Sequence, residues 1–143
     1  FPGAPMIYYG SETGLEGTYA EDGRRCMPWD QLDEDLLGYY KHVISLHKNS
    51  RALRYGSYET VVLDDERRLY GFVRRYEQDV VFAIFNGGDD TAEVVLPLGE
   101  GDQQLWREMI GGADLTASSG KLRVQLEGRG SAWIMPLGST VGM

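Results

Sequence analysis

Residues 3–12 of the chain read Gly3-Ala4-Pro5-Met6-Ile7-Tyr8-Tyr9-Gly10-Ser11-Glu12. Within this stretch, the run 4–9 is apolar on both faces and is bounded by glycine and proline. Such a run is typical of a buried strand of a parallel sheet rather than of an edge strand in a hairpin. The next residues, up to Gly23, are rich in glycine and predict a long loop, a kind of segment that is often functional in compact proteins.

A helical pattern follows the loop, over residues 33–49. Apolar side chains recur at i, i+4, i+7, i+8 and i+11, which places them on one face of a helix. These residues are Leu36, Tyr40, Val43, Ile44 and His47. Asp33 is the predicted N-cap, because its carboxylate can accept hydrogen bonds from the first turn. Asn49-Ser50 is the predicted stop.

From about residue 55 the apolar pattern changes to a period of two, and no further helix is predicted. Glycine- and aspartate-rich turns separate seven expected strands. The strands are Tyr58–Leu63, Arg68–Tyr76, Val80–Phe85, Thr91–Leu96, Gln104–Ile110, Lys121–Leu126 and Ser131–Met135. Strands at short, regular spacing predict an antiparallel β-sandwich. Both faces of Val80–Phe85 are apolar, so this strand is predicted to be central.

A single strand-loop-helix unit cannot stand as a domain, so residues 1–53 are interpreted as the last βα unit of a parallel barrel or sheet. Residues 54–138 then form the sandwich, and 139–143 a frayed tail. Phe1 leads at once into the first strand, without an initiator Met or a signal peptide. We therefore expect the chain to be the end of a longer protein.

Charge and cysteine content exclude several classes of function. The net charge of −8 disfavours nucleic acids and anionic membranes as partners, because both bind basic surfaces. The longest apolar runs are too short to cross a bilayer. The single cysteine, Cys26, allows no internal disulfide, and no Cys/His cluster predicts zinc. A reducing compartment, and so a cytoplasmic location, is favoured.

Residues 3–12 resemble the last barrel strand of the α-amylase family, glycoside hydrolase family 13, where the run reads G-x-P-x-I-Y-Y-G-x-E. The loop after it is similar to the family's P-D-x-R-R-x-M-x-W segment. The matching residues are Gly14, Gly17, Asp22, Arg24-Arg25, Met27 and Trp29-Asp30. The segment is most similar to the neopullulanase, cyclomaltodextrinase and oligosaccharide-hydrolase branches. The family's closing helix and C-terminal β-sandwich match the order of elements predicted above.

The resemblance implies a parent enzyme that cleaves or transfers α-glucosyl units from maltodextrin, cyclodextrin or pullulan-like substrates. Retaining hydrolysis needs two carboxylates about 5–5.5 Å apart. In the family these come from earlier barrel strands, and strand ends converge only in the complete barrel. We therefore expect no catalytic residue in this chain. No cofactor is expected either; calcium stays open for the parent, but no metal site is evident here.

Asp22, Arg24 and Arg25 are the candidate substrate-binding residues, because their charged groups can hydrogen-bond to sugar hydroxyls. The alternative is an Asp–Arg pair that braces the glycine-rich loop. Ser11, Ala20 and Glu21 depart from the family pattern, which puts in doubt a sugar contact through an earlier carboxylate. Glu12 allows a catalytic or a structural role. The structural one is favoured, a buried carboxylate that pairs with an arginine of a neighbouring barrel strand, since a buried charge persists only when it is paired.

Several aromatic and histidine side chains allow two interpretations. Sugar stacking or core packing is open for Tyr8, Tyr9, Tyr19 and Trp29, and likewise for Trp106 and Trp133, with core packing favoured for Tyr8, Tyr9 and both tryptophans of the sandwich. His47 continues the apolar helix face and is interpreted as a core histidine, and neither it nor His42 has an evident nucleophile.

Two functions from different classes remain. The first is the C-terminal end of an α-glucan hydrolase, inactive by itself, whose sandwich covers and stabilises the barrel. The second is a carbohydrate-binding or assembly module that works without the barrel. Because the strand at 4–9 would lack both neighbours, we also expect this segment to be disordered, to pack irregularly or to pair with a second copy.

Overall fold

The computed structural model describes residues 3–18, 22, 24–100, 102 and 104–138. It divides into two compact units, one ending at Lys48 and one beginning at Asn49. The helices are α1 (Glu34–Asn49) and α2 (Arg51–Tyr55), with a short 3-10 turn at Ser11–Thr13. The strands are β1 (Glu59–Asp64), β2 (Leu69–Tyr76), β3 (Asp79–Asn86), β4 (Ala92–Pro97), β5 (Leu105–Glu108), β6 (Asp114–Thr116), β7 (Lys121–Leu126) and β8 (Ser131–Pro136).

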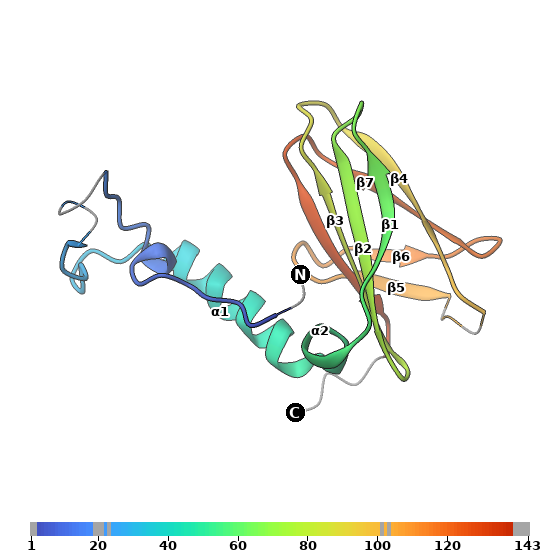
Figure 1. Ribbon diagram of the computed structural model, residues 1–143, viewed down its shortest axis with the longest axis horizontal. Coiled ribbons are helices and arrows are strands. Elements are labelled where there is room, and N and C mark those ends of the chain that lie inside the picture. Colours follow the sequence, from blue (N-terminus) through green and yellow to red (C-terminus); the bar gives the residue numbers. More distant parts are fainter. Residues whose placement is uncertain (1–2, 19–21, 23, 101, 103, 139–143) are drawn as a thin grey trace. The chain divides into compact units, whose positions relative to one another are not determined.

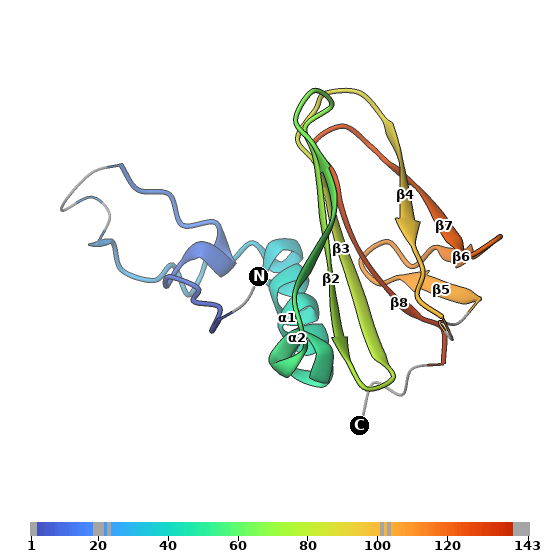
Figure 2. The same ribbon diagram turned by 45° about the vertical axis from the view of Figure 1, so that its right-hand side comes forward.

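The second unit is a β-sandwich of two antiparallel sheets (Figure 1). One sheet has the order β1-β2-β3-β8-β5-β6, and the other pairs β4 with β7. Figure 2 shows the β4–β7 pair facing the larger sheet. Buried Leu, Ile, Val, Phe and Trp side chains from both sheets form one continuous core. The predicted fold class, mainly β with an antiparallel sandwich, is confirmed.

The central position predicted for Val80–Phe85 is also correct, because β3 pairs with β2 on one side and β8 on the other. Its alternate side chains, such as Phe82 and Ile84, enter the core between the sheets. On the opposite face, Val81 packs with Ala52, Leu53 and Met135 in a second, smaller cluster. Both faces of β3 are therefore covered, which explains why its sequence is apolar throughout.

Helix α2 was not predicted, and Ser50 explains how it forms. Asn49-Ser50 ends α1 as expected, because Ser50 has extended backbone angles. The same residue then caps a new helix, since its Oγ accepts from the Leu53 N–H at 3.1 Å. Asp79 strengthens this cap by accepting from Ser50 Oγ at 2.8 Å and from the Ala52 N–H at 2.7 Å. The five-residue helix thus depends on a side chain from β3.

One predicted strand is shorter in the structure, and a short strand after it was not predicted. The segment Gln104–Ile110 was expected as one strand, but β5 covers only Leu105–Glu108. A turn at 109–111 follows it, and the short β6 lies beyond the predicted segment. Glu108 closes this turn, since its carboxylate accepts from the N–H groups of Ile110 (3.0 Å) and Gly111. Strand β6 has three residues, too few to show a period of two.

In the first unit, α1 matches its prediction. The Asp33 carboxylate accepts from the Leu36 N–H at 2.9 Å, which confirms Asp33 as the N-cap. Leu46, which was not among the five residues of the expected apolar face, is the one buried residue of the helix, and all five are half-buried or exposed. No helix in the described residues is long and apolar enough to span a membrane.

The structure also contradicts the buried strand expected at residues 4–9. Residues 3–9 form no strand and are exposed. The physical reason is that a strand satisfies its N–H and C=O groups only through a neighbouring strand, and none pairs with this segment in the described part of the chain. The composition of the run suits a sheet interior, but the described residues provide no sheet for it to join.

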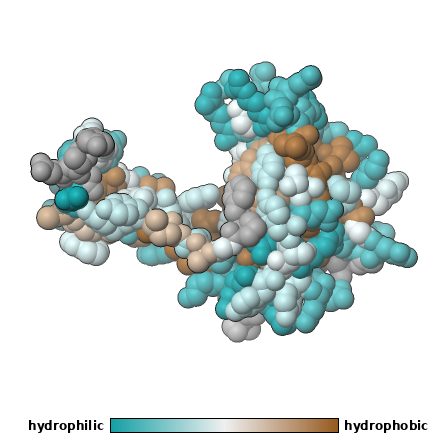
Figure 3. Space-filling view, viewed as in Figure 1, coloured by the Kyte–Doolittle hydropathy of each residue, from teal (hydrophilic) through white to brown (hydrophobic). Residues whose placement is uncertain are grey.

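Apolar side chains of the first unit are exposed as a result of this missing strand pairing. Met6 is 79% exposed, Tyr8 58% and Trp29 77%. Figure 3 shows a sandwich surface that is mainly hydrophilic, with one hydrophobic patch over its upper part. Leu63 of β1, 71% exposed, is the most exposed large hydrophobic residue described in the sandwich. The first unit therefore carries apolar side chains that a monomeric domain usually buries.

Candidate functional site

The turn at residues 10–15 positions Glu12. Gly10 has a φ of 87°, and a Cβ atom there would lie 2.6 Å from Leu15 Cδ2, so only glycine fits. The Gly10 carbonyl accepts from the N–H groups of Thr13 and Leu15, at 3.1 and 2.9 Å, and from Thr13 Oγ1 at 3.1 Å. This compact turn fixes the backbone on both sides of Glu12.

The Glu12 carboxylate has an unpaired oxygen. Its Oε2 atom is buried and has no hydrogen-bond partner among the described residues. Burying a polar group without a partner costs about 1–3 kcal/mol, so native proteins usually supply one. The sequence predicts an arginine from a neighbouring barrel strand as that partner. The role of Glu12 as a structural barrel carboxylate stays a prediction, and the unpaired oxygen is compatible with it.

The loop residues Asp22 and Arg25 come together as a network with Thr18. Asp22 Oδ2 accepts from the Thr18 N–H at 2.8 Å and from Thr18 Oγ1 at 2.9 Å. Asp22 Oδ1 accepts from Arg25 Nε at 2.8 Å. The Thr18 N–H, the Arg25 guanidinium and the Thr18 hydroxyl together lower the pKa of Asp22 from 3.8 to about 2. Each oxygen of Asp22 thus already has partners inside the loop.

The three candidate substrate-binding residues therefore differ in their contacts within the loop. Asp22 and Arg25 brace the loop, which is the alternative that the sequence left open, although bracing does not prevent a further contact with sugar. Arg24 is exposed and makes no hydrogen bond or ion pair with any described residue. Tyr19, Ala20 and Glu21 lie outside the described residues. Substrate binding by Asp22, Arg24 and Arg25 remains a prediction.

Acid should open this loop at an unusually low pH. The folded pKa of Asp22, about 2, lies below the ordinary 3.8, so ionised Asp22 stabilises the loop above pH 3.8, and this stabilisation is lost as pH falls through about 2. In an NMR titration we expect the carboxyl carbon of Asp22 and the amide of Thr18 to shift with one midpoint near pH 2. The Asp22→Asn variant should show the low-pH Thr18 signal at neutral pH. A midpoint near 3.8 would contradict the bracing network.

The aromatic candidates separate into exposed and core residues. Tyr8, Tyr9 and Trp29 are exposed, which differs from the core packing favoured for the two tyrosines. No strand pairs with this segment among the described residues, so its side chains have no sheet to pack against. In contrast, Trp106 is fully buried between the sheets, and Trp133 is half-buried beside the smaller cluster. His47 is half-buried and His42 exposed.

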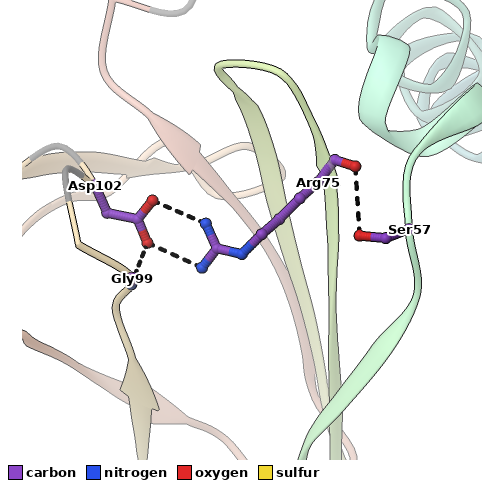
Figure 4. Close-up of polar contacts among 4 residues, drawn as sticks. All are labelled: Ser57, Arg75, Gly99 and Asp102. Atoms are coloured by element: carbon purple, nitrogen blue, oxygen red, sulfur yellow. Dashed lines mark hydrogen bonds and ion pairs between the residues drawn. The ribbon is translucent and has the colours of Figure 1, made fainter.

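A polar cleft that the sequence did not predict lies at one end of the sandwich. Figure 4 shows Arg75 of β2 forming a two-pronged ion pair with Asp102, with Nη1–Oδ1 at 2.8 Å and Nη2–Oδ2 at 2.9 Å. The Gly99 N–H donates to the same Oδ2 at 2.6 Å, while the Arg75 carbonyl accepts from Ser57. The cleft has a volume of about 270 Å³. Its lining residues are Arg75, Glu77, Gln78, Val80, Glu100, Asp102 and Pro136.

The ion pair holds the loop between β4 and β5 against β2. The Asp102 side chain is only 10% exposed. Burial raises the pKa of Asp102, but the Arg75 guanidinium and the Gly99 N–H lower it more, so the net pKa lies below the usual value. Arg75 lies on the same face of β2 as the core residues Leu69 and Val73. The sequence did not indicate this face, because Tyr70, Phe72 and Tyr76 make the opposite face apolar too, and Asp102 is 27 residues away.

Among the described residues, no group of three or more His, Cys, Asp or Glu side chains could hold a metal ion. Cys26 is exposed.

Comparison with known proteins identifies the sandwich. The family described as "Maltogenic Amylase, C-terminal domain" matches residues 59–133. The chain belongs to this family. Neopullulanase 2 of Thermoactinomyces vulgaris is 29% identical over 126 residues, covering 87% of this chain and 22% of that enzyme. A cyclomaltodextrinase of a Bacillus species is 36% identical over 86 residues, covering 59% of this chain and 15% of the enzyme.

Solved structures extend the likeness to the first unit. An Anoxybacillus α-amylase crystal structure superposes with a TM-score of 0.83 and 27% identity, covering 99% of this chain and 30% of that one. Other relatives are named amylopullulanase and intracellular maltogenic amylase. The predicted resemblance to the α-amylase family, with the neopullulanase and cyclomaltodextrinase branches, is confirmed. The chain spans less than a quarter of the length of the neopullulanase and of the cyclomaltodextrinase.

Proposed function

We propose that this chain is the C-terminal part of an α-amylase-type enzyme that hydrolyses α-glucans by a retaining mechanism, and that the chain alone is inactive. The observation that carries the proposal is the match of the sandwich to the maltogenic amylase C-terminal domain over residues 59–133. Relatives named neopullulanase, cyclomaltodextrinase and amylopullulanase indicate substrates of the pullulan, cyclodextrin and maltodextrin type. The two catalytic carboxylates would come from other barrel strands.

The first unit supports a role as the closing βα unit of a barrel. Its apolar side chains at Met6, Tyr8 and Trp29 are exposed, and Glu12 Oε2 is buried without a partner. A covering sheet would bury the first group and supply a cation to the second. Within the assembled barrel, Asp22 and Arg25 would shape the loop at the entrance of the active-site cleft of the barrel. Arg24, which has no partner among the described residues, is the candidate for direct contact with sugar hydroxyls.

The sandwich would then stabilise the barrel and take no part in the chemistry. No cofactor is proposed for this segment, and neither nucleic acid nor membrane is proposed as a partner. We place the enzyme in the cytoplasm, because the chain has one cysteine and a relative from Bacillus subtilis is named as intracellular.

Hydrolysis assays test the proposal directly. The purified chain should release no reducing sugar from maltodextrin, cyclodextrin or pullulan. A longer polypeptide that adds the residues encoded ahead of Phe1 should release it. Hydrolysis by the 143-residue chain itself would overturn the proposal. Strong retention of the chain in a starch-containing native gel, together with an inactive longer polypeptide, would instead favour a carbohydrate-binding module.

We also propose that the chain self-associates through its first unit, because exposed apolar surface is buried whenever a partner is available. Light scattering should give a mass above the 16.0 kDa of one chain. The triple variant Met6→Ser, Tyr8→Ser, Trp29→Ser should shift the mass toward one chain. The matched control is Leu63→Ser, which removes an equally exposed apolar side chain from the sandwich and should leave the mass unchanged. A wild-type mass of one chain would refute this proposal.

A further inference from the structure

The cleft beside Arg75 and Asp102 has hydrogen-bonding capacity that its own ion pair does not use. A guanidinium carries five N–H donors. Two of those on Arg75 reach Asp102, and the other three have no hydrogen-bond partner among the described residues. The Arg75 side chain is 31% exposed, so these donors are accessible from the cleft. Because Asp102 holds the guanidinium rigidly, little side-chain entropy would be lost on binding a ligand.

The cleft combines the fixed Arg75 guanidinium with polar side chains at its rim and two apolar side chains deeper inside. Gln78 and Glu100 are exposed at its rim and carry amide and carboxylate groups. Val80 and Pro136 are buried and line the same cleft. Fixed donors and acceptors beside a small apolar surface are the usual means of recognising a small polar ligand. The volume, about 270 Å³, suits a ligand of about one sugar ring rather than a larger molecule.

Charge decides which class of ligand fits. The lining has one cation, Arg75, and three carboxylates, those of Glu77, Glu100 and Asp102. An anion would be repelled by this excess of negative charge. A metal cation would compete with the guanidinium for Asp102, both of whose oxygens are already occupied. Glu77 is likewise paired with Arg51, at 3.2 Å. A neutral ligand with many hydroxyl groups meets neither obstacle, because hydroxyls both donate and accept.

We propose that this cleft is a sugar-binding site on the sandwich, which takes one glucosyl unit of an α-glucan. The choice of glucose over other neutral sugars rests on the proposed function. Arg75 donates hydrogen bonds to the hydroxyls of the sugar, and Gln78 and Glu100 hydrogen-bond to them from the rim. Val80 and Pro136 contact the apolar face of the ring. Such a site holds the polymer near the enzyme without taking part in bond cleavage.

NMR titration of the full chain with maltotriose tests the site. Amide signals of Gln78, Val80, Gly99 and Asp102 should shift together, with a dissociation constant of about 1 mM or weaker, as expected for so small a contact. The double variant Gln78→Ala, Glu100→Ala should weaken binding about tenfold, because two hydrogen bonds to the ligand are lost. This variant leaves the Arg75–Asp102 pair intact.

The double variant Glu93→Ala, Gln125→Ala is the matched control. It makes the same chemical changes on exposed residues of β4 and β7 and should bind maltotriose as the wild type does. The site is refuted if maltotriose at about 50 mM shifts none of these signals, well above the expected dissociation constant. It is also refuted if calcium or phosphate shifts them and maltotriose does not, or if both double variants bind alike. These readouts are independent of hydrolysis, so failure here leaves the proposed function standing.

Discussion

Replacing Trp106 by alanine is expected to unfold the sandwich or bring it close to unfolding. Trp106 is fully buried, and its ring lies 5.4 Å from that of Phe82, centroid to centroid. Truncating a buried tryptophan costs about 3–5 kcal/mol, against a total of about 5–15 kcal/mol for a small domain. Thermal and urea unfolding followed by circular dichroism should show a Tm lower by about 12 °C or more.

Two other tryptophans provide matched controls for this prediction. Trp29→Ala removes a side chain that is 77% exposed and should change the unfolding of the sandwich by less than about 0.5 kcal/mol. Trp133→Ala, at a half-buried position beside Val81 and Met135, should give an intermediate loss. An equal effect at Trp29 and Trp106 would show that the core between the sheets does not carry the stability of the sandwich.

The sandwich could be predicted because its strands follow a simple rule. Side chains alternate between the two faces of a strand, so a period of two in hydrophobicity indicates which face is buried. β3 departs from this alternation, since both of its faces are apolar, and the reason is that helix α2 and its neighbours cover the outer face at Val81. The position of β3 was therefore predictable, but the identity of its cover was not.

Helix α2 could not be predicted, because its cause lies far away in the sequence. Five residues, Arg51–Tyr55, are too short to show a helical period and too short to be stable alone. Asp79 stabilises the first turn from 27 residues away. The same limit applies to the Arg75–Asp102 cleft, since an inward arginine predicts a buried partner but does not say which one.

The segment at residues 4–9 is the opposite of α2, because here a strand was predicted and does not form. Its sequence describes a strand with two neighbours, and the structure shows exposed, unpaired chain. An apolar pattern indicates which surroundings a segment suits. A strand forms only where a neighbouring strand is present to pair with it. The unpaired Glu12 Oε2 follows the same logic, because its predicted partner would lie on a neighbouring strand and no strand among the described residues pairs with this segment.

Replacing Asn86 by alanine should cost about 3 kcal/mol, the second largest effect expected here, since it leaves several buried polar groups without partners. Asn86 ends β3, is 3% exposed, and joins the two sheets at one end of the sandwich. Its Nδ2 donates to the carbonyls of Asp90 (2.8 Å), Glu127 (3.0 Å) and Leu126 (3.4 Å). Its Oδ1 accepts from the Gly88 N–H at 2.9 Å.

Urea unfolding of three variants separates the hydrogen bonds of Asn86 from its packing. Asn86→Asp keeps the shape and the acceptor but loses the Nδ2 donors, so at neutral pH it should destabilise at least as much as Asn86→Ala, because a buried carboxylate would then face carbonyl oxygens. Gln125→Ala removes an amide from an exposed position whose one contact with Glu93 is 3.4 Å long, and should cost less than about 0.5 kcal/mol. If Asn86→Asp were as stable as the wild type, the link between β3 and the end of β7 would owe its strength to side-chain shape, and the donors of Asn86 would contribute nothing measurable.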